Sequence, residues 1–193
     1  MQVQHPSTYA KMLRVAAAKV VLAVNQIANT PGQQVATVGK MKVFPNAANV
    51  VPGEVEMSLD IRDLSDLHID SLLSQLRLNL EEIATETKTQ IYLTSCLSNQ
   101  PALAKTHIKG AIASVCQDLE LSYTHLPSSA SHDAQELAQI TDMGMIFVPS
   151  KLGVSHDATK YTSPDQCIQG ANILLKTLWE LDMFYSKMQG FIG

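Results

Sequence analysis

The sequence predicts an α+β module, a split β-α-β arrangement with a ferredoxin-like antiparallel sheet and two helices, followed by an α/β segment. Two observations favour the first module. The stretch 9–30 is rich in Ala, Leu, Val and Met and ends at Pro31-Gly32, as a buried helix does. Residues 54–62 alternate apolar and charged side chains, which is typical of a half-buried strand. After residue 97, helical and short apolar stretches alternate, which favours an α/β layer with parallel pairing.

The elements expected in the first module are a helix over 9–30, a strand over 34–44, a strand over 54–62, a helix from Ser65 or Asp66 to about Thr87, and a strand over 90–96. In the strand 34–44, alternation predicts Thr37, Gly39, Met41 and Val43 on one face and Val38, Lys40 and Lys42 on the other. A split β-α-β unit also needs a first strand, which would lie just before residue 5. We expect that strand to be missing.

The second module is expected to hold a helix over 103–119, a short strand over 122–127, a short helix from about His132, a buried strand over 144–148, a loop over 149–162, and a helix from Ser163 to about Tyr185. The predicted boundary between the modules therefore divides the chain into 1–97 and 98–193.

Composition excludes several classes of protein. The 193 residues carry a formal net charge of −4 and no basic stripe, which argues against a nucleic-acid partner. The most apolar stretch, residues 15–24, is interrupted by Lys19 and is too short to cross a bilayer. The first residues do not resemble a secretory signal, so a cytoplasmic location is the default expectation. The three cysteines form no Cys-x-x-Cys pair, and we expect them to be reduced packing residues.

Two tripeptides, Ser131-His132-Asp133 and Ser155-His156-Asp157, invite a catalytic-triad interpretation. Triad members must converge from separate places in a chain, whereas consecutive side chains project in different directions. No Gly-x-Ser-x-Gly elbow is present either. We therefore reject a serine hydrolase.

The histidines allow other chemistry. His156 follows a predicted buried strand in a glycine-containing loop, where it is either a metal ligand or a hydrogen-bonded loop residue. Only Asp157 could join it in that loop. His132 precedes a short helix, so it either faces an anion or caps the helix with a solvated ring.

Arg62 and Asn49 also have two interpretations each. Arg62 shares a strand face with Asp60, so it either forms a surface ion pair or captures a substrate carboxylate through two hydrogen bonds. Asn49 lies in a turn, a place that asparagine commonly occupies for structural reasons alone. His5 is too close to the terminus to interpret from composition.

Several segments together resemble one family, the peptidase M20-type metal-dependent amidohydrolases. They are Thr37-Val38-Gly39, Asn49-Val50-Val51-Pro52-Gly53-Glu54-Val55, Leu59-Asp60-Ile61-Arg62-Asp63, His132-Asp133-Ala134-Gln135-Glu136, Gly144-Met145-Ile146-Phe147-Val148-Pro149-Ser150 and Gly153-Val154-Ser155-His156. The sequence most resembles the branch of allantoate amidohydrolase, N-carbamoyl-L-amino acid hydrolase and β-ureidopropionase.

The resemblance implies a metal-dependent enzyme with two Zn²⁺ or Mn²⁺ ions and a smaller lid domain that also forms the homodimer. Residues 1–97 correspond to the lid and residues 98–193 to the C-terminal part of the catalytic domain. His156 matches the last metal ligand, and His132 matches a histidine that contacts substrate near the scissile carbon. Arg62 and Asn49 match lid residues that bind the substrate carboxylate, Asn49 across the dimer. His5 matches a histidine that helps to hold the reacting group.

The departures from the family pattern matter too. Ser131 replaces a glycine, and residues 6–11 differ from the family's Ala-Gly-Thr-Thr-Pro-Met. The family's other metal ligands and its general-base glutamate lie upstream of the lid, in sequence that this chain does not contain. We therefore expect a fragment of an amidohydrolase of linear amide or ureide C–N bonds, inactive alone and possessing at most one inherited metal ligand. A separate N-terminal catalytic segment could complement it. The alternative is a non-catalytic dimerising or small-molecule-binding module.

Overall fold

The computed structural model describes residues 1–4, 12–155 and 157–189. The chain divides into two compact units, Met1–Pro101 and Ala102–Gly193, each described here by itself. The division lies four residues beyond the boundary predicted at 97. No helix among the described residues is both long and apolar enough to cross a membrane.

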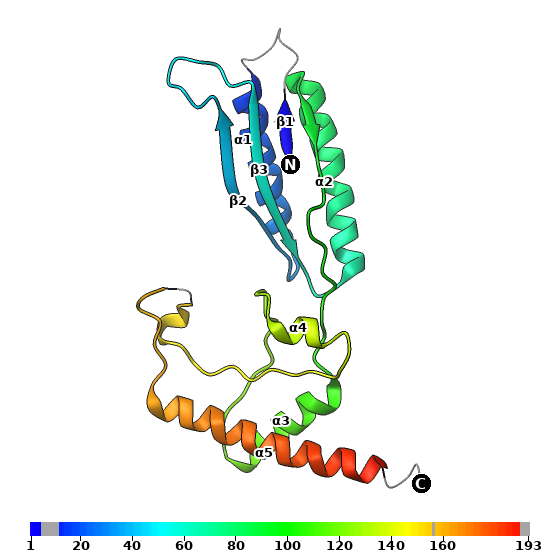
Figure 1. The fold of residues 1–193 in the computed structure, drawn as a ribbon, viewed down its shortest axis with the longest axis vertical. Coiled ribbons are helices and arrows are strands. Elements are labelled where there is room, and N and C mark those ends of the chain that lie inside the picture. Colours follow the sequence, from blue (N-terminus) through cyan, green and yellow to red (C-terminus); the bar gives the residue numbers. More distant parts are fainter. Residues whose placement is uncertain (5–11, 156, 190–193) are drawn as a thin grey trace. The chain divides into compact units, whose positions relative to one another are not determined.

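Unit 1 is an antiparallel sheet packed against two helices (Figure 1). The strands are β1 (Gln2–Gln4), β2 (Val35–Phe44), β3 (Glu54–Arg62) and β4 (Gln90–Tyr92), in the spatial order β2-β3-β1-β4. The helices are α1 (Leu13–Ala28) and α2 (Asp66–Thr87), and they share one apolar core with the sheet. This arrangement confirms the predicted split β-α-β module with an antiparallel, ferredoxin-like sheet.

The first strand, which the sequence led us to expect missing, is present as β1. It pairs antiparallel with β3 on one side and with β4 on the other, so it occupies the interior of the sheet. Its central residue, Val3, is fully buried. A strand of three residues is too short to produce an alternating sequence pattern, and this explains why the expectation was wrong.

The prediction of which β2 residues share a face is wrong, because β2 contains a bulge. The pairing of β2 with β3 shifts between Val38 and Lys40, so that Gly39 has no partner in the ladder. Ala36 and Val38 share a face before the bulge, whereas Val43 reaches the core side after it. A single alternation through 34–44 therefore assigned the residues before the bulge to the wrong face, because one extra residue reverses the phase.

The predicted start of α2 is confirmed. The Ser65 side chain accepts a hydrogen bond of 3.3 Å from the backbone N–H of His68, so Ser65 is the N-cap. The helix ends at Lys88, which adopts a left-handed conformation with φ of 51°. The apolar stripe of α2, which includes Leu72, Leu76 and Leu80, is buried in the core of unit 1.

Unit 2 contains α3 (Thr106–Asp118), α4 (Asp133–Leu137), a 3₁₀ turn η2 (Lys151–Gly153) and α5 (Pro164–Gln189). The start of α5 is a reciprocal capping box: Ser163 Oγ accepts from the Gln166 N–H at 3.3 Å, and Gln166 Oε1 accepts from the Ser163 N–H at 3.3 Å. Pro164 occupies the first helical position, where its missing N–H costs no hydrogen bond.

The two strands predicted in this unit, over 122–127 and 144–148, do not form. Residues 144–148 run as an irregular segment (Figure 1) with Gly144 packed on Ile108 of α3 and Val148 packed on Gly170 of α5. A strand needs a neighbour to satisfy its backbone groups, and the described residues of unit 2 provide none. The apolar pattern is present, but its pairing partner is absent from these residues.

The contact between Gly144 and α3 gives a test of packing in unit 2. A Cβ at Gly144 would lie 2.5 Å from Cγ2 of the buried Ile108, so Gly144→Ala should destabilise the unit by about 1–3 kcal/mol. A Cβ at Gly110, in α3, meets nothing within 4 Å, so Gly110→Ala should stabilise it by up to about 1 kcal/mol. Urea unfolding followed by the fluorescence of Trp179, the single tryptophan, reports on this unit. Equal midpoints for the two variants would contradict the packing.

Candidate functional site

His132 is the N-cap residue of α4, but its side chain makes no capping hydrogen bond. Its Nε2 lies 2.6 Å from Oγ of Ser128, and its ring packs edge-on against Phe147 with centroids 5.9 Å apart. Ser128 and His132 are both half-buried. The ring of His132 is therefore not a solvated helix cap, which was one of its two expected roles. Because α4 has only five residues, we assign no anion site to its N-terminus.

The contact with Ser128 occupies Nε2 of His132. A neutral imidazole donates at one ring nitrogen and accepts at the other, and a hydroxyl can do either, so the contact is compatible with both tautomers. The hydrogen bond and the edge-on packing of Phe147 together orient the ring. Sequence reasoning missed both Ser128 and Phe147 as partners. Their signal was weak, since a serine in a loop and a phenylalanine in an apolar run have many ordinary roles.

Arg62 is the last residue of β3, and its guanidinium holds the carboxylate of Asp60. Nε donates to Asp60 Oδ1 at 3.0 Å, and Nη2 donates to Oδ2 at 2.6 Å. The hydrogen bonds from Arg62 hold the pKa of the Asp60 carboxyl below its usual value, and the same hydrogen bonds raise the pKa of Arg62. Both side chains are about half exposed, so the pair contributes under about 1 kcal/mol to stability.

Asn49 is exposed in the loop that joins β2 to β3. The loop begins where Phe44 pairs with Glu54, and Arg62 pairs with Val35 at the other end of the same hairpin. Nine residues of β3 span about 27 Å at the usual rise per residue. Asn49 and Arg62 of one chain are therefore too far apart to bind the same small carboxylate.

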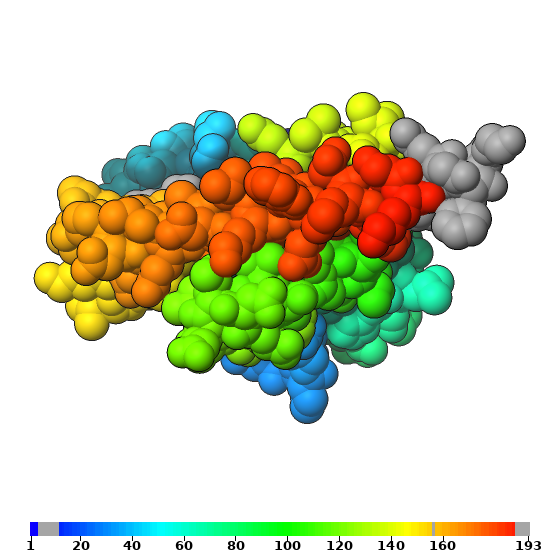
Figure 2. Space-filling model, turned by 90° about the horizontal axis from the view of Figure 1, so that it is seen from below, coloured from blue at the N-terminus to red at the C-terminus, as the bar shows by residue number. Residues whose placement is uncertain are grey.

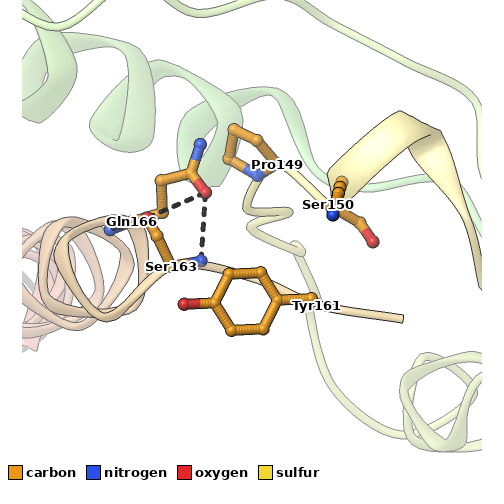
Figure 3. A pocket seen from close by; sticks show the side chains of 6 residues that line it. Pro149, Ser150, Tyr161, Ser163 and Gln166 are labelled. Atoms are coloured by element: carbon orange, nitrogen blue, oxygen red, sulfur yellow. Dashed lines mark hydrogen bonds between the residues drawn. The ribbon is translucent and has the colours of Figure 1, made fainter. Parts of the chain in front are cut away.

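Unit 2 has a hollow of about 350 Å³ between η2 and the start of α5, lined by Pro149, Ser150, Lys151, Tyr161, Ser163 and Gln166 (Figure 3). Backbone and side-chain hydrogen bonds shape its wall: Lys151 N–H donates to the Tyr161 carbonyl at 2.8 Å, and Ser150 Oγ donates to the Val154 carbonyl at 2.7 Å. Two lining residues, Lys151 and Tyr161, flank the stretch of sequence that includes the position of the predicted metal ligand. Sequence reasoning did not identify these lining residues.

Two predicted site residues, His5 and His156, lie outside the described residues. The neighbour of His156, Asp157, uses Oδ1 to accept from the Thr159 hydroxyl at 2.6 Å and from the Thr159 N–H at 2.8 Å. These bonds, led by the one from the hydroxyl, lower the pKa of Asp157. Among the described residues, no three His, Cys, Asp or Glu side chains gather as a group that could hold a metal ion. The described residues therefore do not by themselves fit a dinuclear centre.

Comparison with known proteins identifies the family. The sequence profile of Peptidase family M20/M25/M40 matches residues 10–180. This chain belongs to that family. Its M20 relatives include an N-carbamoyl-L-amino acid amidohydrolase from Geobacillus stearothermophilus, 35% identical over 166 residues. That match covers 86% of this chain and 41% of the relative.

Two further relatives belong to the same M20 branch. An allantoate amidohydrolase from Escherichia coli strain K12 is 29% identical, over 76% of this chain and 36% of the relative. A hydantoinase/carbamoylase-family amidase from Burkholderia multivorans superposes with a TM-score of 0.81 at 28% identity, over 91% of this chain and 45% of that one. The M20 chain described here thus spans less than half the length of these relatives.

Replacing Ser128 tests its contact with His132. Ser128→Ala should remove the hydrogen bond at Nε2 of His132 and destabilise unit 2 by about 1 kcal/mol, the net contribution of one hydrogen bond. Long-range ¹H–¹⁵N spectra of the histidine rings report the hydrogen bonding of each ring nitrogen. Ser128→Thr keeps the hydroxyl and is the control. Unchanged ring ¹⁵N shifts of His132 in Ser128→Ala would refute the assignment.

The Arg62–Asp60 pair predicts a pH dependence. A lowered folded-state pKa gives stability that is present above the unfolded-state value and is lost as the pH falls through the folded-state value. Arg62→Gln should therefore raise the pKa of Asp60 towards its usual value and destabilise unit 1 at neutral pH but not in acid. Carboxyl ¹³C titration and urea unfolding at both pH values measure this. Lys42→Gln, which removes an exposed pair with Glu56, should leave Asp60 unaffected.

Proposed function

We propose that this chain is the lid and the C-terminal part of the catalytic domain of an amidohydrolase that hydrolyses a linear amide or ureide C–N bond. The substrate class is that of allantoate or an N-carbamoyl-L-amino acid. The observation that carries the proposal is the match over residues 10–180 to a family whose similar members are named amidohydrolases of those compounds.

In this proposal His132 contacts the substrate near the scissile carbon. The hydroxyl of Ser128 and the ring of Phe147 fix the imidazole, so little reorganisation is needed when charge develops on the reacting carbonyl oxygen. A hydrogen-bond donor placed in this way stabilises the transition state more than the ground state.

Arg62 and Asn49 are proposed to bind the substrate carboxylate. Arg62 already holds a carboxylate, that of Asp60, through two of its nitrogen atoms, so its guanidinium has the geometry that a substrate carboxylate requires. Since Asn49 lies at the opposite end of the β2–β3 hairpin, both can contact one substrate only if they come from different chains. This separation supports a homodimer formed through unit 1, with a site composed across it.

The described residues do not form a metal centre, and His156 is the one metal ligand that the family resemblance assigns to this chain. We therefore propose that the chain is inactive by itself and that the part of the enzyme preceding the matched region supplies the other ligands and the general base. Zn²⁺ and Mn²⁺ both accept imidazole and carboxylate ligands. The alternative function is a non-catalytic dimerising or small-molecule-binding module, which the absence of a ligand cluster among the described residues favours.

Complementation tests the proposal. The purified chain should not hydrolyse allantoate or N-carbamoyl-L-amino acids. Mixing it with the part of the Geobacillus relative that precedes the match should produce turnover, and His132→Ala should reduce that turnover about 10²–10³-fold. His125→Ala, a change to an exposed histidine of the same unit, is the control.

Metal content distinguishes the outcomes. The mixture should retain about two ions per pair of chains after dialysis, with a loss in His156→Ala, whereas the chain alone should not. Turnover by the chain alone would refute its proposed dependence on the other segment. A stable dimer with neither metal nor turnover on mixing would establish the non-catalytic alternative.

A further inference from the structure

Arg62 holds the side chain of Asp60 in the way that it would hold the carboxylate of a ligand. Nε of Arg62 lies 3.0 Å from Oδ1 and 3.1 Å from Oδ2 of Asp60, and Nη2 lies 2.6 Å from Oδ2. Two nitrogen atoms on one edge of the guanidinium thus contact both carboxylate oxygens. Charge-assisted contacts of this two-point kind are the strong and geometrically specific ones that arginine makes, so Asp60 occupies an edge that a bound carboxylate would use.

The β3 strand keeps Asp60 within reach of Arg62. One residue, Ile61, separates them, so both side chains stand on the sheet face opposite to Ile61, which packs on the apolar core. In the ladder with β2, Asp60 is paired with Thr37 and Arg62 with Val35. Because backbone pairing sets this geometry, a free ligand has to compete with a carboxylate that is always beside the guanidinium.

The contact between Asp60 and Arg62 can exchange with a ligand. The side chain of Arg62 is 42% exposed and that of Asp60 is 52% exposed, so water and solutes reach both. An exposed ion pair shifts an equilibrium by about fivefold at most, because water screens the charges and two side chains lose freedom. A carboxylate that makes further contacts can therefore displace Asp60 at small cost. The negative charge of Asp60 also repels a second carboxylate that approaches the same guanidinium.

We propose that Asp60 is an internal competitor for the carboxylate-binding edge of Arg62 and that it thereby sets how tightly Arg62 binds a carboxylate ligand. Without a ligand, Asp60 occupies this edge. When a ligand binds, its carboxylate replaces that of Asp60, which turns to water. The hydrogen bonds that hold the pKa of Asp60 below its usual value are lost in this exchange. The choice of ligand, an N-carbamoyl amino acid, rests on the proposed function, but the exchange needs neither metal nor turnover.

Exchange at Arg62 is measured on the full chain by NMR. N-carbamoylglycine, the smallest N-carbamoyl amino acid, is titrated at constant ionic strength, and its uncharged amide is the control ligand. The Nε–Hε resonance of Arg62 should shift and saturate, and the carboxyl ¹³C resonance of Asp60 should move in parallel towards its value in Arg62→Gln. The amide should change neither resonance. A shift at Arg62 with no change at Asp60, or no shift at either residue, would overturn the proposal.

Two variants of β3 with the same change in charge test the competition. Asp60→Asn removes the competing charge but keeps one acceptor oxygen, and it should lower the dissociation constant of N-carbamoylglycine about two- to fivefold. Glu56→Gln changes a side chain that is 54% exposed on the same strand, about 20 Å from Arg62 and beyond the screening length, and should leave the constant unchanged. Circular dichroism should show both variants folded. Equal or weaker binding in Asp60→Asn, or equal gains in both variants, would refute the competition.

Kinetics separate this competition from the proposed function. In the mixture with the part of the Geobacillus relative that precedes the match, Asp60→Asn should lower the KM for an N-carbamoyl-L-amino acid about two- to fivefold. It should leave kcat unchanged, because Asp60 competes with bound substrate but does not touch the reacting bond. Exchange on the chain alone without turnover in the mixture would preserve the competition and refute the proposed activity. Turnover with an unchanged KM would preserve the activity and refute the competition.

Discussion

The pairing of β1 inside the sheet is the interaction on which unit 1 depends. Val3 pairs with Val55 of β3 on one side and with Ile91 of β4 on the other. Met1 extends the contact, since its amino group donates to the Met57 carbonyl and its carbonyl accepts from the Met57 N–H. Without β1, the two flanking strands would be separated by two interstrand spacings, about 10 Å. The helix α2, which connects them, would then have no continuous sheet beneath it.

The same sheet determines how the candidate substrate residues can work. Ladder pairing along β2 and β3 makes the hairpin a stiff spacer with Asn49 in the loop at one end and Arg62 at the other. At the bulge, Lys40 N–H donates to the Ser58 hydroxyl at 2.9 Å. Beyond the bulge, Val43 again faces the apolar core. Backbone hydrogen bonds rather than flexible side chains set this spacing, so the proposed sharing of one substrate by Asn49 and Arg62 is consistent only with residues from two copies.

Local patterns predicted the elements whose signals are local. The Ser65 cap predicted the start of α2, and the alternation in β3 predicted that strand. Ser163-Pro164 predicted the start of α5. The bulge in β2 and the short β1 were missed because pairing, not local pattern, determines them. In the candidate site, the types of residue at Arg62 and His132 were recognisable. Their partners differed: Asp60 was predictable from strand alternation, whereas the Ser128 contact depends on an irregular loop.

The unformed strand at 144–148 shows why a correct pattern can predict a structure that does not form. Its apolar sequence is suited to burial between layers, but burial of backbone amides is favourable only when a neighbouring strand accepts their hydrogen bonds. In unit 2 the helices α3 and α5 supply one apolar face, and the described residues supply no such neighbour. The exposed apolar side chains of α5, the helix in orange to red in Figure 2, are a second case: they are suited to burial, but the described residues of unit 2 leave them in water, which is unfavourable. In both places the local pattern states which environment the side chains favour, whereas the fold of the whole unit decides whether they obtain it.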